Sequence, residues 1–232
     1  MTALCGAVFA IAGCRGFDCV NGSGNQVTET RNVEPFREIE VGGAIKLVIR
    51  QDSSTSLRIV ADDNIQDRIE TRVSGGKLHI EMDGNFCETG PITIYASSRT
   101  LEGVDASGAV EVISDGVLSA ERFMLDLSGS TKVNLQVNTG EMRTDASGSV
   151  ELILKGQARS HEIDMSGAGE VEALDFVVGN YRINTSGSSD LRINVMNNLD
   201  VESSGASEIS YRGNPRDITN HSSGASSLNK IQ

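Results

Sequence analysis

The sequence predicts an all-β fold, and within that class a right-handed parallel β-helix whose coils contain about 19 residues each. Three observations predict it. From residue 107 on, a Ser-Gly dipeptide recurs seven times at nearly regular intervals, polar and apolar residues alternate after each of these copies, and the chain has 25 glycines but only 4% aromatic residues. Alternation indicates strands, and a fixed long period indicates stacked coils.

The Ser-Gly dipeptides follow one another at intervals of 21, 19, 19, 20, 18 and 19 residues. At about 3.3 Å per residue, a coil of this length traces a path of about 60 Å, enough for three short strands and their bends. We expect each glycine at a sharp bend with a positive φ. The pairs are Ser107 and Gly108, Ser128 and Gly129, Ser147 and Gly148, Ser166 and Gly167, Ser186 and Gly187, Ser204 and Gly205, and Ser223 and Gly224.

Three positions of each repeat are predicted to face the core. Five residues after the serine, every repeat has an aliphatic residue: Val112, Val133, Leu152, Val171, Leu191, Ile209 and Leu228. The positions three and one before the serine are mainly apolar, beginning with Val104 and Ala106.

The first half of the chain is less regular. Residues 39–49 have a weaker form of the repeat and are predicted to form the first coils. Residues 62–72 have apolar residues four apart, which predicts a short helix or turn with Asp63 as N-cap. A strand is expected over 77–82, and the irregular segment 228–232 is a candidate cap for the far end.

The N-terminus has the pattern of a lipoprotein export signal. Residues 1–13 are predicted to be a signal peptide, because a short apolar core leads to Ile11-Ala12-Gly13-Cys14, which resembles the bacterial lipobox. No Lys or Arg precedes this core, so an ordinary secretory signal is the alternative. We expect lipidation at Cys14, a flexible tether over 14–26, and one domain over 27–232.

Composition excludes several functions. A net charge of −12 disfavours nucleic acid and anionic membrane surfaces, and leaves cations, neutral glycans and basic proteins as partners. The sequence has no GxSxG, P-loop, GxGxxG or CxxC motif. His161 is predicted to be a hydrogen-bonded core histidine, and pairing of Cys19 with Cys87 stays open.

Two columns of the repeat are charged. Two residues before the serines lie Asp105, Asp126, Asp145, Asp164, Asn184, Glu202 and His221. Four residues after the serines lie Glu111, Lys132, Glu151, Glu170, Asp190, Glu208 and Ser227. Three explanations compete for the aspartates: hydrogen bonds to backbone N–H groups at the bend, cation binding by Asp105, Asp126, Asp145 and Asp164, or acid catalysis on a polysaccharide. The bend explanation is preferred, because a catalytic pair should interrupt the repeat.

Several segments resemble the head GIN domain family of auto-transporter-adhesin-like envelope proteins, found mainly in Bacteroidetes. They are Gly22-Ser23-Gly24-Asn25, Glu29-Thr30-Arg31, residues 39–44, Ala61-Asp62-Asp63-Asn64, Ile69-Glu70-Thr71, the Ser-Gly repeats, and residues 211–215. The resemblance covers nearly the whole mature chain. It implies a β-helical fold, a lipoprotein signal and an adhesin role, and it supplies no catalytic residues.

These observations together predict a non-enzymatic, lipid-anchored binding or adhesin-like module of the cell envelope, either periplasmic or surface-exposed. The expected partners are a glycan or an envelope protein, with the membrane contacted through the lipid anchor, no nucleic acid and no cofactor. Exposed end coils leave homo-oligomers open. The alternatives are a carbohydrate-active β-helix enzyme and a purely structural envelope protein.

Overall fold

The computed structural model describes residues 19–232; the predicted signal peptide and Cys14 lie outside them. The fold is all-β, with 75% strand, 2% helix and one large sheet that is not closed into a barrel. The elements are β1 (Gln26–Arg31), β2 (Glu38–Gly43), β3 (Lys46–Gln51), β4 (Ser56–Asp62), α1 (Asp63–Gln66), β5 (Ile69–Ser74), β6 (Lys77–Met82), β7 (Thr93–Ser98), β8 (Gly103–Gly108), β9 (Glu111–Gly205), β10 (Glu208–Arg212), β11 (Asp217–Ser222) and β12 (Ser227–Lys230).

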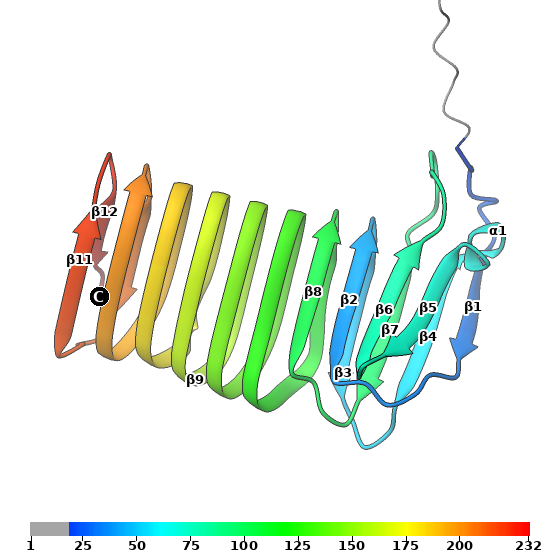
Figure 1. The fold of residues 1–232 in the computed structure, drawn as a ribbon, viewed down its shortest axis with the longest axis horizontal. Coiled ribbons are helices and arrows are strands. Elements are labelled where there is room, and N and C mark those ends of the chain that lie inside the picture. Colours follow the sequence, from blue (N-terminus) through cyan, green and yellow to red (C-terminus); the bar gives the residue numbers. More distant parts are fainter. Residues whose placement is uncertain (1–18) are drawn as a thin grey trace, which may run out of the picture.

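The repeats stack through parallel pairing. In Figure 1, β9 is one long ribbon whose successive turns lie side by side, with β8 at one end of the row and β11 and β12 at the other. The pairing of β8 with β9 places Ser107 beside Ser128, and β10 lies between β9 and β12 so that Ile209 is beside both Leu191 and Leu228. Residues one repeat apart in the sequence are therefore neighbours in the sheet.

The predicted core columns are confirmed. From Val112 to Ile209, each aliphatic residue five positions after a serine is at most 2% exposed, and Leu228 is partly buried. The columns three and one before the serine are also buried, except at Asn220 and Ser222 in the last coil, where nothing stacks beyond them. Burying each of these aliphatic side chains contributes about 1.5–3 kcal/mol.

The segment 39–49 joins the stack as predicted, since β2 pairs with β8 and β3 with β9, both in parallel. The next strands, β6 and β7, also pair in parallel, with β2 and β3 respectively. Beyond them the pairing is antiparallel: β4 pairs with β7 and β1, and β5 with β6. These hairpin-like pairs cover the N-terminal end of the stack (Figure 1). The sequence did not reveal this arrangement.

The predicted helix exists but is one turn long, and the predicted cap is wrong by one position. Asp62 is the N-cap, and Asp63 is the first helical residue. The Asp62 carboxylate does not cap the helix. It accepts hydrogen bonds from the Gln26 side chain at 2.7 Å and the Gly90 backbone N–H at 2.9 Å.

Residues 19–26, expected to be part of a flexible tether, are held on the domain. A disulfide joins Cys19 to Cys87. The backbone N–H of Val20 donates to Asn85 O at 2.8 Å, and that of Gly22 donates to Glu88 O at 2.7 Å. A segment with a single aliphatic residue, Val20, is thus fixed mainly by its backbone and its cysteine, contributions that hydrophobic patterning does not register.

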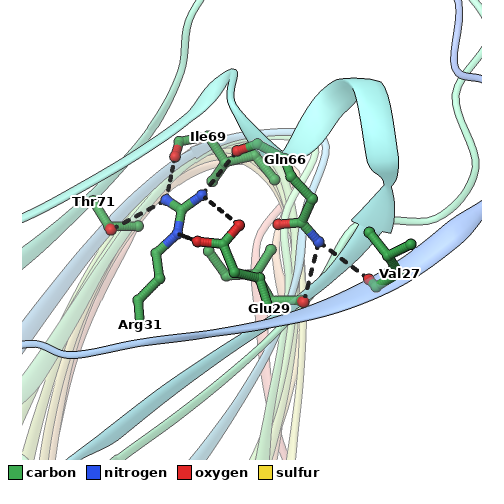
Figure 2. Close-up of polar contacts among 7 residues, drawn as sticks. Val27, Glu29, Arg31, Gln66, Ile69 and Thr71 are labelled. Carbon is green, nitrogen blue, oxygen red and sulfur yellow. Dashed lines mark hydrogen bonds and ion pairs between the residues drawn. The ribbon is translucent and has the colours of Figure 1, made fainter.

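At the N-terminal end of the stack, Arg31 forms hydrogen bonds that connect β1 with α1 and β5 (Figure 2). The Arg31 guanidinium donates to Glu29 Oε1 at 2.9 Å, to Gln66 O at 2.8 Å, to Thr71 Oγ1 at 3.2 Å, and to Ile69 O. The Gln66 side chain in turn donates to Val27 O at 3.1 Å. Arg31 therefore joins β1 to the carbonyl groups at the end of α1 and the start of β5.

Replacing Arg31 by methionine is expected to lower the free energy of unfolding by about 2 kcal/mol. The change leaves partly buried carbonyl groups of residues 66 and 69 without their charged donor. Arg50→Met is the control, because Arg50 is 59% exposed and makes only surface ion pairs, worth well under about 1 kcal/mol. Urea unfolding of both variants measures the difference, and equal losses would contradict a clamping role for Arg31.

Candidate functional site

A ladder of acidic side chains runs along one face of the stack. It is longer than the sequence indicated, because Glu40 lies between Asp105 and His79 in the paired strands β8, β2 and β6. We call it the acidic ladder; its members are His79, Glu40, Asp105, Asp126, Asp145, Asp164, Asn184, Glu202 and His221. The sequence contains a signal for Glu40, because Glu40 lies two residues before Gly42-Gly43, just as each aspartate lies two residues before a Ser-Gly dipeptide. No comparable sequence signal marks His79.

Side chains, not the bend, hold two of the four aspartates, Asp145 and Asp164. Arg143 forms ion pairs at 2.9 Å with both Asp145 and Asp164, and Asn184 donates to Asp164 at 2.7 Å. Among the hydrogen bonds of residues 19–232, no backbone N–H donates to the four aspartates, so the preferred explanation from sequence is wrong. The N–H after the bend is already used, because Ala109 donates to Gly43 O in the neighbouring coil at 2.8 Å.

The start of the ladder is poorly neutralised. Burial, followed by the negative charges of Asp126 and Glu40, raises the pKa of the Asp105 carboxyl, and Lys77 and His79 only partly oppose them. Of the ion pairs in residues 19–232, none includes Asp105, Asp126 or Glu202. The face therefore presents negative charge at the spacing of neighbouring strands, about 4.8 Å.

The Ser-Gly bends form a ridge between two polar grooves. A groove of about 630 Å³ runs between the ladder and the serines from Asp126 to Ser223. A second groove of about 720 Å³, on the other side of the ridge, is lined by the second charged column from Lys132 to Glu208. The seven glycines of the ridge have φ between 77° and 120°.

The glycines also stack closely, and Gly43 begins their column. A Cβ placed on Gly108 would lie 2.8 Å from Gly43 O, and one on Gly129 would lie 2.7 Å from Gly108 O. The ridge thus requires glycine both for its backbone conformation and for the approach of adjacent coils.

His161 lies in the core as predicted, but only one of its two ring nitrogens has a hydrogen-bond partner. It is 1% exposed, Nε2 lies 3.0 Å from Thr144 Oγ1, and the ring packs edge-on against Phe176 at 5.8 Å between centroids. Nδ1 has no hydrogen-bond partner. Burial lowers the pKa of His161 to about 3, so the ring is neutral and unsuited to ligand binding at the surface.

The sequence of residues 35–215 matches the family model described as "Putative auto-transporter adhesin, head GIN domain". The chain belongs to the head GIN domain family. The resemblance found from individual motifs is thereby confirmed. Membership places the chain with adhesin-like proteins of the cell envelope, a family without an assigned enzymatic reaction.

Solved structures of 20% sequence identity share the fold of this head GIN domain. A protein of Bacteroides fragilis titled a "putative adhesin" superposes with a TM-score of 0.86 over 91% of this chain and 100% of its own. A "putative lipid binding protein" of Parabacteroides distasonis gives 0.68 over 93% of this chain and 100% of its own. A "putative adhesin" of Parabacteroides merdae gives 0.62 over 93% and 100%.

A search of curated proteins finds no match to the chain. Across residues 19–232, no helix has the length and apolar character needed to cross a membrane.

Proposed function

We propose that this head GIN domain is a non-enzymatic, lipid-anchored binding module of the cell envelope, built as a right-handed parallel β-helix and attached through Cys14. Parallel pairing at repeat-length offsets and the buried columns support the β-helix. The lipobox-like sequence before Cys14 and the envelope family support the anchor.

The acidic ladder carries the proposal of a binding surface. Carboxylates and serine hydroxyls are repeated along the same face beside a groove of about 630 Å³. A repetitive surface of this kind suits an extended, repetitive partner. Because the face is negatively charged, we assign it an envelope glycan that carries amino and hydroxyl groups.

A ladder variant tests this assignment. Asp126→Asn combined with Glu202→Gln is expected to weaken retention of an amino-sugar polymer at least tenfold, since two unpaired carboxylates of the ladder are removed without stranding a basic partner. Binding of the full chain to a glycan array that includes amino-bearing, neutral and anionic polymers measures the effect. Glu34→Gln combined with Glu88→Gln, at two exposed positions outside both grooves, is the matched control and should leave retention unchanged.

The same array separates the alternative functions. Retention that falls with added salt, without release of shorter sugars, supports the binding module. Release of products would instead favour a polysaccharide-cleaving enzyme. Absence of retention for every polymer would favour a structural envelope protein and overturn the proposal.

A further inference from the structure

The N-terminal end of the acidic ladder gathers a mixed set of metal-ligating groups. Glu40 on β2 and His79 on β6 are directly paired, and Glu81 follows two residues later on the same face of β6. One donor atom from each of the three lies within 4.8 Å of the other two. In residues 19–232 this is the one such grouping of three His, Cys, Asp or Glu side chains.

The histidine lacks a satisfactory partner there. His79 Nδ1 lies 3.1 Å from Glu40 Oε2, but the two are not aligned for a hydrogen bond. Nδ1 is shielded from solvent, and the side chain is only 17% exposed. A buried ring nitrogen without a hydrogen bond is costly, and a metal ion bound to Nδ1 would remove that cost.

We propose that Glu40, His79 and Glu81 form a binding site for a divalent transition-metal ion of the zinc class. One imidazole and two carboxylates are ligands that zinc accepts, at about 2.0–2.2 Å from the ion. In the tetrahedral geometry of zinc sites, two ligands at that distance lie about 3.3–3.6 Å apart. Side-chain rotations that bring the donors closer by up to about 1–1.5 Å therefore complete the site.

The surrounding charges set the strength of the site. Lys77 lies 3.9 Å from Glu40, and Arg72 lies 3.2 Å from Glu81, so a bound ion displaces two exposed ion pairs. Ion pairs near the surface contribute little to stability, so losing them weakens metal binding only slightly. Asp105, beside Glu40, adds negative charge that favours the ion. Three protein ligands leave a fourth position open to water or to a donor from a partner.

Calcium is a poor fit to this donor set. It takes six to eight oxygen ligands and does not use imidazole, whereas this site offers a nitrogen and few oxygens. The ladder's aspartates, all within residues 19–232, are not gathered into a group of three ligand atoms within 4.8 Å of one another. Competition by calcium therefore distinguishes the site from a diffuse acidic surface.

Titration of the full chain with zinc, followed by calorimetry, tests the proposal. We expect one zinc ion per chain, unaffected by a hundredfold excess of calcium. His79→Gln and Glu81→Gln are expected to weaken zinc binding at least tenfold. His221→Gln, at the opposite end of the same ladder, is the matched control and should bind as the unmodified chain does.

Cobalt gives a second readout, because its visible absorption reports imidazole and carboxylate coordination directly. The spectrum should appear with the unmodified chain and with His221→Gln and be lost with His79→Gln. Thermal melting in a chelator verifies that each variant is folded. No saturable zinc site, displacement of zinc by calcium, or equal losses for the His79 and His221 variants would each overturn the proposal.

Discussion

Replacing Gly129 by alanine is expected to lower the free energy of unfolding by about 3 kcal/mol. Gly129 has a φ of 84°, where a side chain costs about 1–2 kcal/mol. The new Cβ would lie 2.7 Å from Gly108 O and 3.0 Å from Gly108 N, both rigid backbone atoms of the adjacent coil. Forcing coils apart to relieve such overlap adds about 1–3 kcal/mol.

Gly116 separates the two contributions. Its φ is 98°, but a Cβ there meets no atom within 4 Å. Gly116→Ala should therefore cost only about 1–2 kcal/mol from backbone strain. Chemical denaturation of both variants gives the comparison. Equal destabilisation would mean that the glycine column does not bring adjacent coils into contact.

The second large effect is acid destabilisation through His161. Burial holds the pKa of its imidazole at about 3, against 6.5 for an ordinary histidine. Below pH 6.5 the unfolded chain binds a proton at this position and the folded chain does not, so stability falls as pH falls, until the folded pKa is reached. The loss is about 1.4 kcal/mol per pH unit, or about 2 kcal/mol between pH 6.5 and 5.

His161→Leu should remove this part of the pH dependence. Free energies of unfolding measured at half-unit steps from pH 7.5 to 5 should fall less steeply in His161→Leu than in the unmodified chain. His221→Leu, at an exposed position, should keep the original slope. Parallel curves for all three proteins would show that His161 does not take up the proton on unfolding.

The regular half of the fold could be predicted from the sequence because its information is periodic. Val112, Val133 and Leu152 recur at the same place in each repeat, and a recurring aliphatic column has no other explanation than stacking. The positive φ at residues such as Gly148 follows from the same logic, since only glycine bends easily in that way.

The N-terminal end could not be predicted because its contacts are specific and distant in sequence. The antiparallel pairing of Val27 with Ala61 has no counterpart in the coils built from the Ser-Gly repeats, which pair in parallel. Arg31 finds its partners 35 to 40 residues away, where no pattern marks them. Hydrophobic periodicity gives no information about which backbone carbonyl groups accept hydrogen bonds from a charged side chain.

The candidate site was partly visible for the same reasons. The aspartate column could be found by counting back from each serine, but its hydrogen-bond partners could not. Arg143 lies two residues before Asp145, and side chains two residues apart in a strand point to the same face. The contact between these two residues is therefore compatible with the alternating pattern of the sequence. The proximity of His79 to Glu40 required the pairing of β2 with β6.

The stacked fold requires equivalent residues of successive repeats to lie one strand spacing apart. Distances between pairs of spin labels test this directly. The labels are attached to introduced cysteines in chains that also have Cys5→Ser and Cys14→Ser. The three pairs are Ser128→Cys with Ser204→Cys, Ser107→Cys with Ser204→Cys, and Ser107→Cys with Ser223→Cys. These pairs are separated by four, five and six coils, which predicts backbone separations of about 19, 24 and 29 Å at 4.8 Å per coil. Equal steps of about 5 Å along this series are the expected result; separations that do not grow evenly with the number of repeats would contradict the stacked fold and the ladder built on it.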